Sequence, residues 1–198
     1  MSVRDDIMAG GEAVISVKRR DWREEVYDWV ETLSFSLIVV VLLFSFLFKL
    51  VQVDGKSMQN TLMDHDRVMI QSLFYEPRQF DVVVINDQNY YHKPLIKRII
   101  AVEGQIINID FEKGVVTVDG IVLDEPYIKE ITHIRGNPKK PDYLILYPAT
   151  VPEGKVFVMG DNRNESSDSR ELGFIDKKSI MGRALVRVYP FDQIKIVK

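Results

Sequence analysis

The run TLSFSLIVVVLLFSFLF, residues 32–48, contains no charged side chain. Its seventeen residues lie at the short end of the roughly 17–25 that an α-helix needs to cross a bilayer. Lys49 follows, and its long side chain can reach the headgroups while residues 50–53 continue the apolar stretch. The pattern therefore predicts a transmembrane anchor over residues 32–53.

Two other structures would also contain such a run. A buried core helix is one, although a core helix is rarely apolar on every face. A cleaved signal peptide is the other, with an apolar region of about 7–15 residues followed by a small-x-small cleavage site. Val51-Gln52-Val53 offers no small residues after this run, and thirty-one residues precede it. An uncleaved anchor fits these features better.

The segment before the run predicts its surroundings. Residues 1–20 are expected to be a mobile tail, and residues 21–31 a helical lead-in whose tryptophans suit the headgroup level. Lys18-Arg19-Arg20 and Arg23 lie close to the span, which favours a cytoplasmic N-terminus by the positive-inside rule. Residues 1–31 are thus predicted to be cytoplasmic and interfacial. Lys49 and Lys56, on the other side, weaken this orientation.

The chain after residue 53 changes to short β-rich runs, and helical periodicity is nearly absent. Asp119-Gly120 between two apolar runs is a strong hairpin signal. The prediction for residues 54–198 is a mainly β, antiparallel domain, either a folded-over sheet or an irregular barrel, with an exposed excursion over residues 129–142. The expected strands are 67–71, 80–85, 95–102, 105–110, 114–118, 121–123, 143–147, 155–159, 180–188 and 193–197.

Composition excludes several classes of function. The chain has 198 residues and a formal net charge of −3, so nothing favours a nucleic-acid partner. It contains no cysteine, which excludes disulfides, thiolate zinc sites and a cysteine nucleophile. The three histidines do not have the spacing of a zinc site, so we expect neither a metal nor a cofactor.

Lys97 is the first candidate for chemistry, because it interrupts the apolar strand Leu95–Ile100. Alternate side chains on a strand share a face, so Lys97 lies with Leu95 and Ile99. Loss of hydration there would lower its pKa and leave a neutral amine that acts as a general base. The alternative is a solvated face that the lysine merely covers.

Ser57 is the matching nucleophile candidate, in a turn-prone stretch where Gly55 allows a peptide to approach the backbone. A serine in a polar turn is more often only a turn residue, and the pairing with Lys97 is what favours a catalytic role. Gly55-Lys56-Ser57 also imitates the end of a phosphate-binding loop, but the glycine required at position 50 is Leu50. Nothing in the sequence supports a Ser-His-Asp triad.

The polar stretch GDNRNESSDSR, residues 160–170, follows the apolar strand 156–159. So dense a polar loop is either a solvated turn or a buried network that organises a site. Asp168 and Arg170 have opposite charges and can pair across the turn.

Together these segments resemble the bacterial type I signal peptidases over roughly residues 30–198. The resemblance rests on residues 55–62, 66–68, 97–104 and 160–170, and the last is the most specific. It implies that Ser57 is the nucleophile and Lys97 the general base, with the Ser57 N–H as one oxyanion donor and Gly55 and Met58 beside the substrate. It also implies four supporting residues: Ser166, which orients the lysine amine, Asp168, Arg170 and Arg98.

Three residues depart from the family pattern. Asn60 stands where proline is usual, Gln105 where aspartate is common, and His65 where glycine usually precedes Asp66. We expect them to change stability or rate rather than the chemistry. Gly55 also lacks the hydroxyl that some members use as a second oxyanion donor.

The resemblance implies a single-pass membrane protein with its peptidase domain, residues 54–198, outside the cytoplasm. Its partners would be the lipid bilayer and signal peptides with small residues at positions −1 and −3. Two alternatives remain: a catalytically inactive, membrane-tethered β-domain that binds peptides, for which Asn60 is the warning sign, and a Ser-Lys protease that cleaves itself or a regulator.

Overall fold

The structure, a computed structural model, describes residues 22–87 and 91–198. The expected tail over residues 1–20 lies outside the described residues. The chain divides into two compact units, residues 1–42 and 43–198. The first contains most of one long helix, and the second contains all of the β-strands.

The helix α1 (Trp22–Leu47) has 26 residues, none of them buried. It is the one helix of the described chain that is long and apolar enough to cross a membrane. The predicted helical lead-in is confirmed for residues 22–31, which form the first turns of α1. The predicted anchor extended to residue 53, and this part is wrong, because Phe48–Gln52 form strand β1. Strand β2 (Arg67–Gln71) pairs with β1 along one edge, so Lys49 lies on a sheet, two residues after the helix ends.

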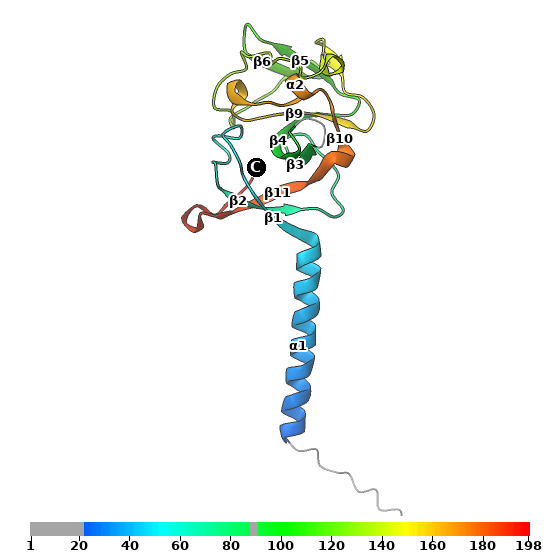
Figure 1. Ribbon diagram of the computed structural model, residues 1–198, viewed down its shortest axis with the longest axis vertical. Coiled ribbons are helices and arrows are strands. Elements are labelled where there is room, and N and C mark those ends of the chain that lie inside the picture. Colours follow the sequence, from blue (N-terminus) through cyan, green and yellow to red (C-terminus); the bar gives the residue numbers. More distant parts are fainter. Residues whose placement is uncertain (1–21, 88–90) are drawn as a thin grey trace, which may run out of the picture. The chain divides into compact units, whose positions relative to one another are not determined.

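The β unit consists of two antiparallel sheets, which confirms a mainly β domain (Figure 1). The larger has eight strands in the order β1-β2-β11-β3-β4-β9-β10, with β12 paired to β11. Its further strands are β3 (Val82–Asp87), β4 (Lys93–Val102), β9 (Lys155–Met159), β10 (Ile175–Asp176), β11 (Ile180–Tyr189) and β12 (Lys195–Ile196).

The smaller sheet has the order β7-β6-β5-β8. Its strands are β5 (Ile106–Asp110), β6 (Val115–Val118), β7 (Ile121–Val122) and β8 (Ala149–Thr150). The predicted hairpin at Asp119-Gly120 is confirmed: both residues have positive φ and connect β6 to β7. Within the β unit, Figure 1 shows β5 and β6 at the end opposite to β1 and β2, with β3, β4 and β9 between them.

One predicted strand is wrong. Within 143–147, Tyr143 ends a short 3-10 helix (η1, Pro141–Tyr143), and the residues after it form no ladder. Ile145 is buried between two exposed leucines, so the apolar alternation of a strand is present. Prolines at 141 and 148 flank this segment and cannot donate ladder hydrogen bonds, which explains why the pattern misleads. The short strands β8 and β10 carry too few residues to be recognised from periodicity.

The predicted excursion over residues 129–142 is confirmed as mostly exposed coil, apart from the buried Thr132 and the start of η1. The remaining short helices are α2 (Ser169–Leu172), η2 (Arg163–Glu165), η3 (Lys177–Ser179) and η4 (Phe191–Gln193).

Strand β4 organises the core and the site. Along Lys93–Arg98 it pairs with β3, but on its other side β9 pairs only from Arg98 onward. Consequently, no described strand covers the second edge of β4 between Lys93 and Lys97. Three core clusters meet at this strand, which contributes Ile96, Ile99 and Ile100 to one cluster each.

Candidate active site

The nucleophile candidate Ser57 lies in a turn anchored by its neighbours. Met58 and Leu62 are buried in the core, and both Thr61 N–H and Leu62 N–H donate to the Met58 carbonyl, at 3.0 and 2.8 Å. Gly55 has φ +97°, which favours glycine, and its N–H donates to Asp64 Oδ1 at 2.8 Å. The turn therefore fixes the backbone while leaving Ser57 partly exposed.

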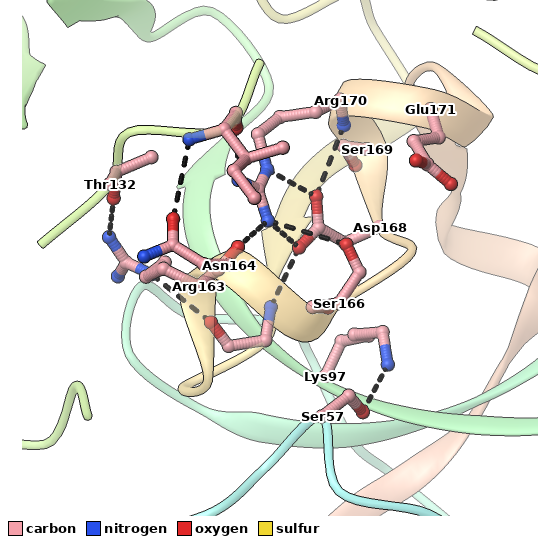
Figure 2. A network of polar contacts seen from close by, with 12 residues as sticks. Ser57, Lys97, Thr132, Arg163, Asn164, Ser166, Asp168, Ser169, Arg170 and Glu171 are labelled. Atoms are coloured by element: carbon pink, nitrogen blue, oxygen red, sulfur yellow. Dashed lines mark hydrogen bonds and ion pairs between the residues drawn. The ribbon is translucent and has the colours of Figure 1, made fainter. Parts of the chain in front are cut away.

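Lys97 meets Ser57 directly: Nζ lies 2.7 Å from Oγ (Figure 2). The lysine is only 3 % exposed, so the alternative of a solvated face is wrong. Its neighbour across the ladder is Val83, itself buried among the aliphatic side chains of β3, β4 and β9. The geometry brings together the two residues that the sequence predicted as a pair.

Burial lowers the pKa of Lys97 from 10.5 to about 8. The carboxylates of Asp168 and Asp161 act in the opposite direction, because negative charge favours the ammonium form. Arg170 and Lys93 lower the pKa further. Desolvation is the largest of these effects, so a substantial fraction of the amine is neutral at mildly alkaline pH and can accept a proton.

The polar loop is a buried network and not a solvated turn. Arg170 Nε and Nη2 both donate to the carboxylate of Asp168 at 2.8 Å, as Figure 2 shows. Burial alone would raise the pKa of Asp168, but Arg170 and the Gly160 N–H hold it below its usual range. Arg170 also donates to the carbonyls of Ile134 and Arg163 at 2.6 Å, which ties this loop to the long excursion.

A second buried ion pair supports the turn over residues 55–62, which contains Ser57 and is called the nucleophile turn below. Arg98 donates through Nε and Nη2 to Asp161 at 2.9 and 2.7 Å, and both side chains are almost fully buried. Thr61 Oγ1 donates to Asp161 Oδ2 and accepts from Arg98 Nη2. The arginine thus connects β4 to the turn that follows Ser57. The sequence analysis named Arg98 but missed Asp161 and Thr61, although Asp161 lies in the loop that it singled out.

Asn162 is the other residue that the sequence analysis missed. Its N–H donates to the Ser57 carbonyl at 3.0 Å, and its side-chain amide donates to the Lys56 carbonyl at 3.2 Å. The loop after β9 therefore holds the turn that contains Ser57 through two hydrogen bonds from one buried residue. Only its position directly after Asp161 would have suggested this role.

Ser166 does not make the expected contact. Its Oγ is buried, and within the described chain it has no hydrogen-bond partner, so the predicted bond to the lysine amine is not formed here. The hydroxyl packs beside Gly160: a Cβ at Gly160 would lie 2.3 Å from Ser166 Oγ and 2.5 Å from the Ser57 carbonyl oxygen. Position 160 therefore has no room for a side chain, because the Ser57 carbonyl and the Ser166 hydroxyl lie against the residue that follows β9.

The departures from the family pattern have local explanations. Asn60 has φ +86°, a value that proline cannot adopt, and its side chain donates to the Ile128 carbonyl at 3.0 Å. His65 has φ +68°, the conformation for which glycine is favoured. Gln105 accepts from the Val102 N–H and donates to Asp119, so it fastens the turn before β5.

A pocket of about 160 Å³ opens over the serine and lysine. Gly55 and Met58, predicted to lie beside the substrate, both line it, as does the uncovered end of β4. In residues 22–87 and 91–198 no group of three or more His, Asp or Glu side chains could hold a metal ion.

Known proteins are similar to this chain over most of its length. A family model described as "Signal peptidase, peptidase S26" matches residues 26–189. Signal peptidase I of Bacillus licheniformis is 31% identical over 189 residues, covering 90% of this chain and 96% of that protein. Signal peptidase I S of Bacillus subtilis (strain 168) is 31% identical over 179 residues, covering 87% and 94%.

One more distant relative is similar over nearly the same length, and a solved structure is similar over about half of the chain. Signal peptidase IB of Staphylococcus aureus (strain COL) is 28% identical over 184 residues, covering 87% of this chain and 94% of that protein. The crystal structure of a signal peptidase I from Enterococcus faecalis V583 is 29% identical, with a TM-score of 0.43, and covers 55% of this chain and 97% of that one. The match of the family model over most of the chain shows that it belongs to the peptidase S26 family of signal peptidases, serine proteases that remove signal peptides from preproteins.

Proposed function

We propose that this chain cleaves signal peptides with Ser57 as the nucleophile and Lys97 as the general base. The observation that carries the proposal is the 2.7 Å contact between Nζ and Oγ, made by a lysine that is almost fully buried. An amine with a pKa of about 8 supplies the neutral base that an unactivated serine hydroxyl needs. Asn162, Asp161 and Arg98 position this pair through the nucleophile turn.

The substrate is held as an additional strand. Backbone groups on the free edge of β4 between Lys93 and Lys97 are available to an extended peptide, which gains main-chain hydrogen bonds there. The pocket beside that edge is lined by Val53, Met58 and Ile96. Alternate residues of an extended peptide point to the same side. Small side chains at −1 and −3 would therefore enter the apolar part of this pocket together.

The reaction follows from these positions. Neutral Lys97 takes the proton of the Ser57 hydroxyl as Oγ attacks the scissile carbonyl. The Ser57 N–H stabilises the oxyanion, an interaction worth on the order of 3–4 kcal/mol per donor. The lysine ammonium then protonates the leaving amine, and a water molecule that passes its proton to the lysine hydrolyses the acyl-enzyme.

Gly55 does not complete the oxyanion hole in this structure. It has no hydroxyl, and its N–H is bonded to Asp64.

The membrane holds the enzyme where its substrates emerge. The apolar helix α1 supports a single-pass anchor, and Lys18-Arg19-Arg20 with Arg23 supports a cytoplasmic N-terminus. The β unit would then lie outside the cytoplasm. Anchoring concentrates the site at the surface where signal peptides are already embedded.

Peptide cleavage tests the proposal. The purified full-length chain in neutral detergent should cleave a peptide containing Ala-x-Ala after the second alanine, and Ser57→Ala and Lys97→Ala should abolish turnover. Ser179→Ala, a serine in η3, is the matched control and should retain the rate. Binding without cleavage by the unaltered chain would indicate an inactive peptide-binding domain. One intramolecular cut without turnover would indicate a self-cleaving protease.

A further inference from the structure

The pocket over Ser57 is lined by a carboxylate, that of Glu165, which the proposed catalytic mechanism does not use. Glu165 is the last residue of the short helix η2 (Arg163–Glu165); it is exposed and lines this pocket together with Ser167. Asp54, the other carboxylate of the lining, is paired with Lys93 at 2.9 Å.

Glu165 is held in place beside the nucleophile. Its backbone N–H donates to the Asn162 carbonyl at 3.1 Å, and its Oε2 accepts from Asn162 Nδ2 at 3.0 Å. The same Nδ2 donates to the Lys56 carbonyl, in the residue before Ser57. Two hydrogen bonds therefore connect the carboxylate to the backbone of the nucleophile turn, through a fully buried asparagine.

The position of Glu165 along the pocket indicates which part of a substrate it meets. The free edge of β4 runs from Lys93 to Lys97 and ends where β9 and its following loop begin to cover the strand. Glu165 and Ser167 line the same pocket as Ser57 and that edge, so when the −1 and −3 residues occupy the edge, these two residues are left to face the residues after the scissile bond. An extended chain advances about 3.3 Å per residue, so the first two residues after the scissile bond fall in this region.

We propose that Glu165 is a specificity-determining residue that selects among the first residues of the mature protein, favouring basic and disfavouring acidic side chains at +1 and +2. This inference rests on the proposed function. The nearby cation Lys129 has other partners, since its Nζ lies 3.9 Å from Glu130 Oε1 and 3.3 Å from Gln59 Oε1. Within the described residues Glu165 forms no ion pair, so its charge is left to act on the substrate.

The test measures kcat/KM of the full-length chain in neutral detergent on three peptides that differ only at +2, carrying lysine, glutamine or glutamate. Glu165→Gln removes the charge but keeps an oxygen that accepts from Asn162. It should reduce the lysine-to-glutamate preference by roughly threefold to fivefold, the size expected for an exposed charge pair. Glu165→Lys should reverse the preference. Glu112→Gln, in the exposed turn after β5, is the matched control and should leave the preference unchanged.

Three outcomes separate the possible failures. An equal loss of kcat/KM on all three peptides would mean that Glu165 only supports the turn, and the inference would be wrong. A charge response at −2 instead of +2, in a second peptide set, would overturn it by placing Glu165 on the signal-peptide side. Absence of cleavage by the unaltered chain, or cleavage that survives Ser57→Ala, would instead refute the proposed function. Added salt should reduce the preference in the unaltered chain and have little effect in Glu165→Gln.

Discussion

Two lysines on one strand have opposite environments. Lys97 and Lys93 lie four residues apart on the same face of β4, because side chains alternate along a strand. Lys97 is 3 % exposed and contacts Ser57, whereas the Lys93 side chain is 52 % exposed and pairs with Asp54 in solvent. The difference comes from what surrounds each side chain: Lys97 lies among Ser57 and the charged groups of the loop after β9, whereas the partner of Lys93 is an exposed carboxylate. Burial, and not the residue type, gives Lys97 the lowered pKa that the proposed base requires.

The largest expected effect is the removal of the buried amine. Lys97→Met should lower kcat by at least about 10²–10⁴-fold, the usual contribution of a general base. It should also stabilise the fold at neutral pH by on the order of 3 kcal/mol, because an ammonium whose pKa falls from 10.5 to about 8 is disfavoured in the folded state. Urea unfolding at pH 7 measures the second effect.

The pH dependence of stability sharpens this prediction. Between about pH 8 and 10.5 the unfolded chain holds the Lys97 proton and the folded chain releases it, so stability rises with pH across this window. Lys97→Met should remove that rise. Lys113→Met, at an exposed lysine in the turn before β6, is the matched control and should keep it. If Lys97→Met were as unstable as a cavity mutant at pH 7, the lysine would not be strained by burial.

The next largest effect concerns the buried ion pair between Arg98 of β4 and Asp161. Asp161→Asn keeps the shape of the side chain but leaves the Arg98 guanidinium buried without its counter-charge. Breaking such a pair costs about 3–5 kcal/mol. The free energy of unfolding from urea titration measures it. A loss below about 1 kcal/mol would mean that Arg98 is compensated by its other contacts, the Phe80 carbonyl and the ring of Tyr127.

Much of the fold could be predicted from local sequence. Residues that are close together in the sequence determine the helix of the long apolar run, the alternating strands and the turn at Asp119-Gly120. The boundary at Phe48 could not, because its β conformation depends on pairing with Gln71 of β2, a partner that lies outside any local window of sequence. Residues 143–147 fail for the converse reason, since they alternate like a strand but no strand of the described chain pairs with them.

The site was predictable where residue types are unusual for their surroundings. A lysine among isoleucines is such a signal, and it identified the Lys97–Ser57 pair. Asn162 bonds to a backbone carbonyl and Thr61 to the carboxylate of Asp161. Both partners are distant in the sequence, so a polar residue in a turn does not reveal them. The positive φ of Asn60 is likewise visible only in three dimensions, and it shows that this turn differs from one built on proline.

A smaller effect is expected from pH on the rate. With a pKa of about 8, the neutral fraction of Lys97 rises about tenfold between pH 7 and 9, and kcat/KM should rise with it and then level off. Lys93→Gln removes a positive charge that lowers this pKa, so it should move the midpoint to higher pH. The measurement uses a peptide without groups that titrate in this range. A rate independent of pH between about 6 and 9 would contradict the assignment of Lys97 as the base.

The smallest effect is expected at the open end of β4. Asp54→Asn removes the partner of Lys93, but both side chains are more than half exposed, so water and salt replace the interaction. The free energy of unfolding should change by less than about 1 kcal/mol, and the change should vanish at high salt. The Asp161→Asn loss should persist there, because ions do not reach a buried pair. If Asp54→Asn cost as much as Asp161→Asn, the two ends of β4 would be equally enclosed, and exposure would not explain why Lys97 and not Lys93 is the proposed base.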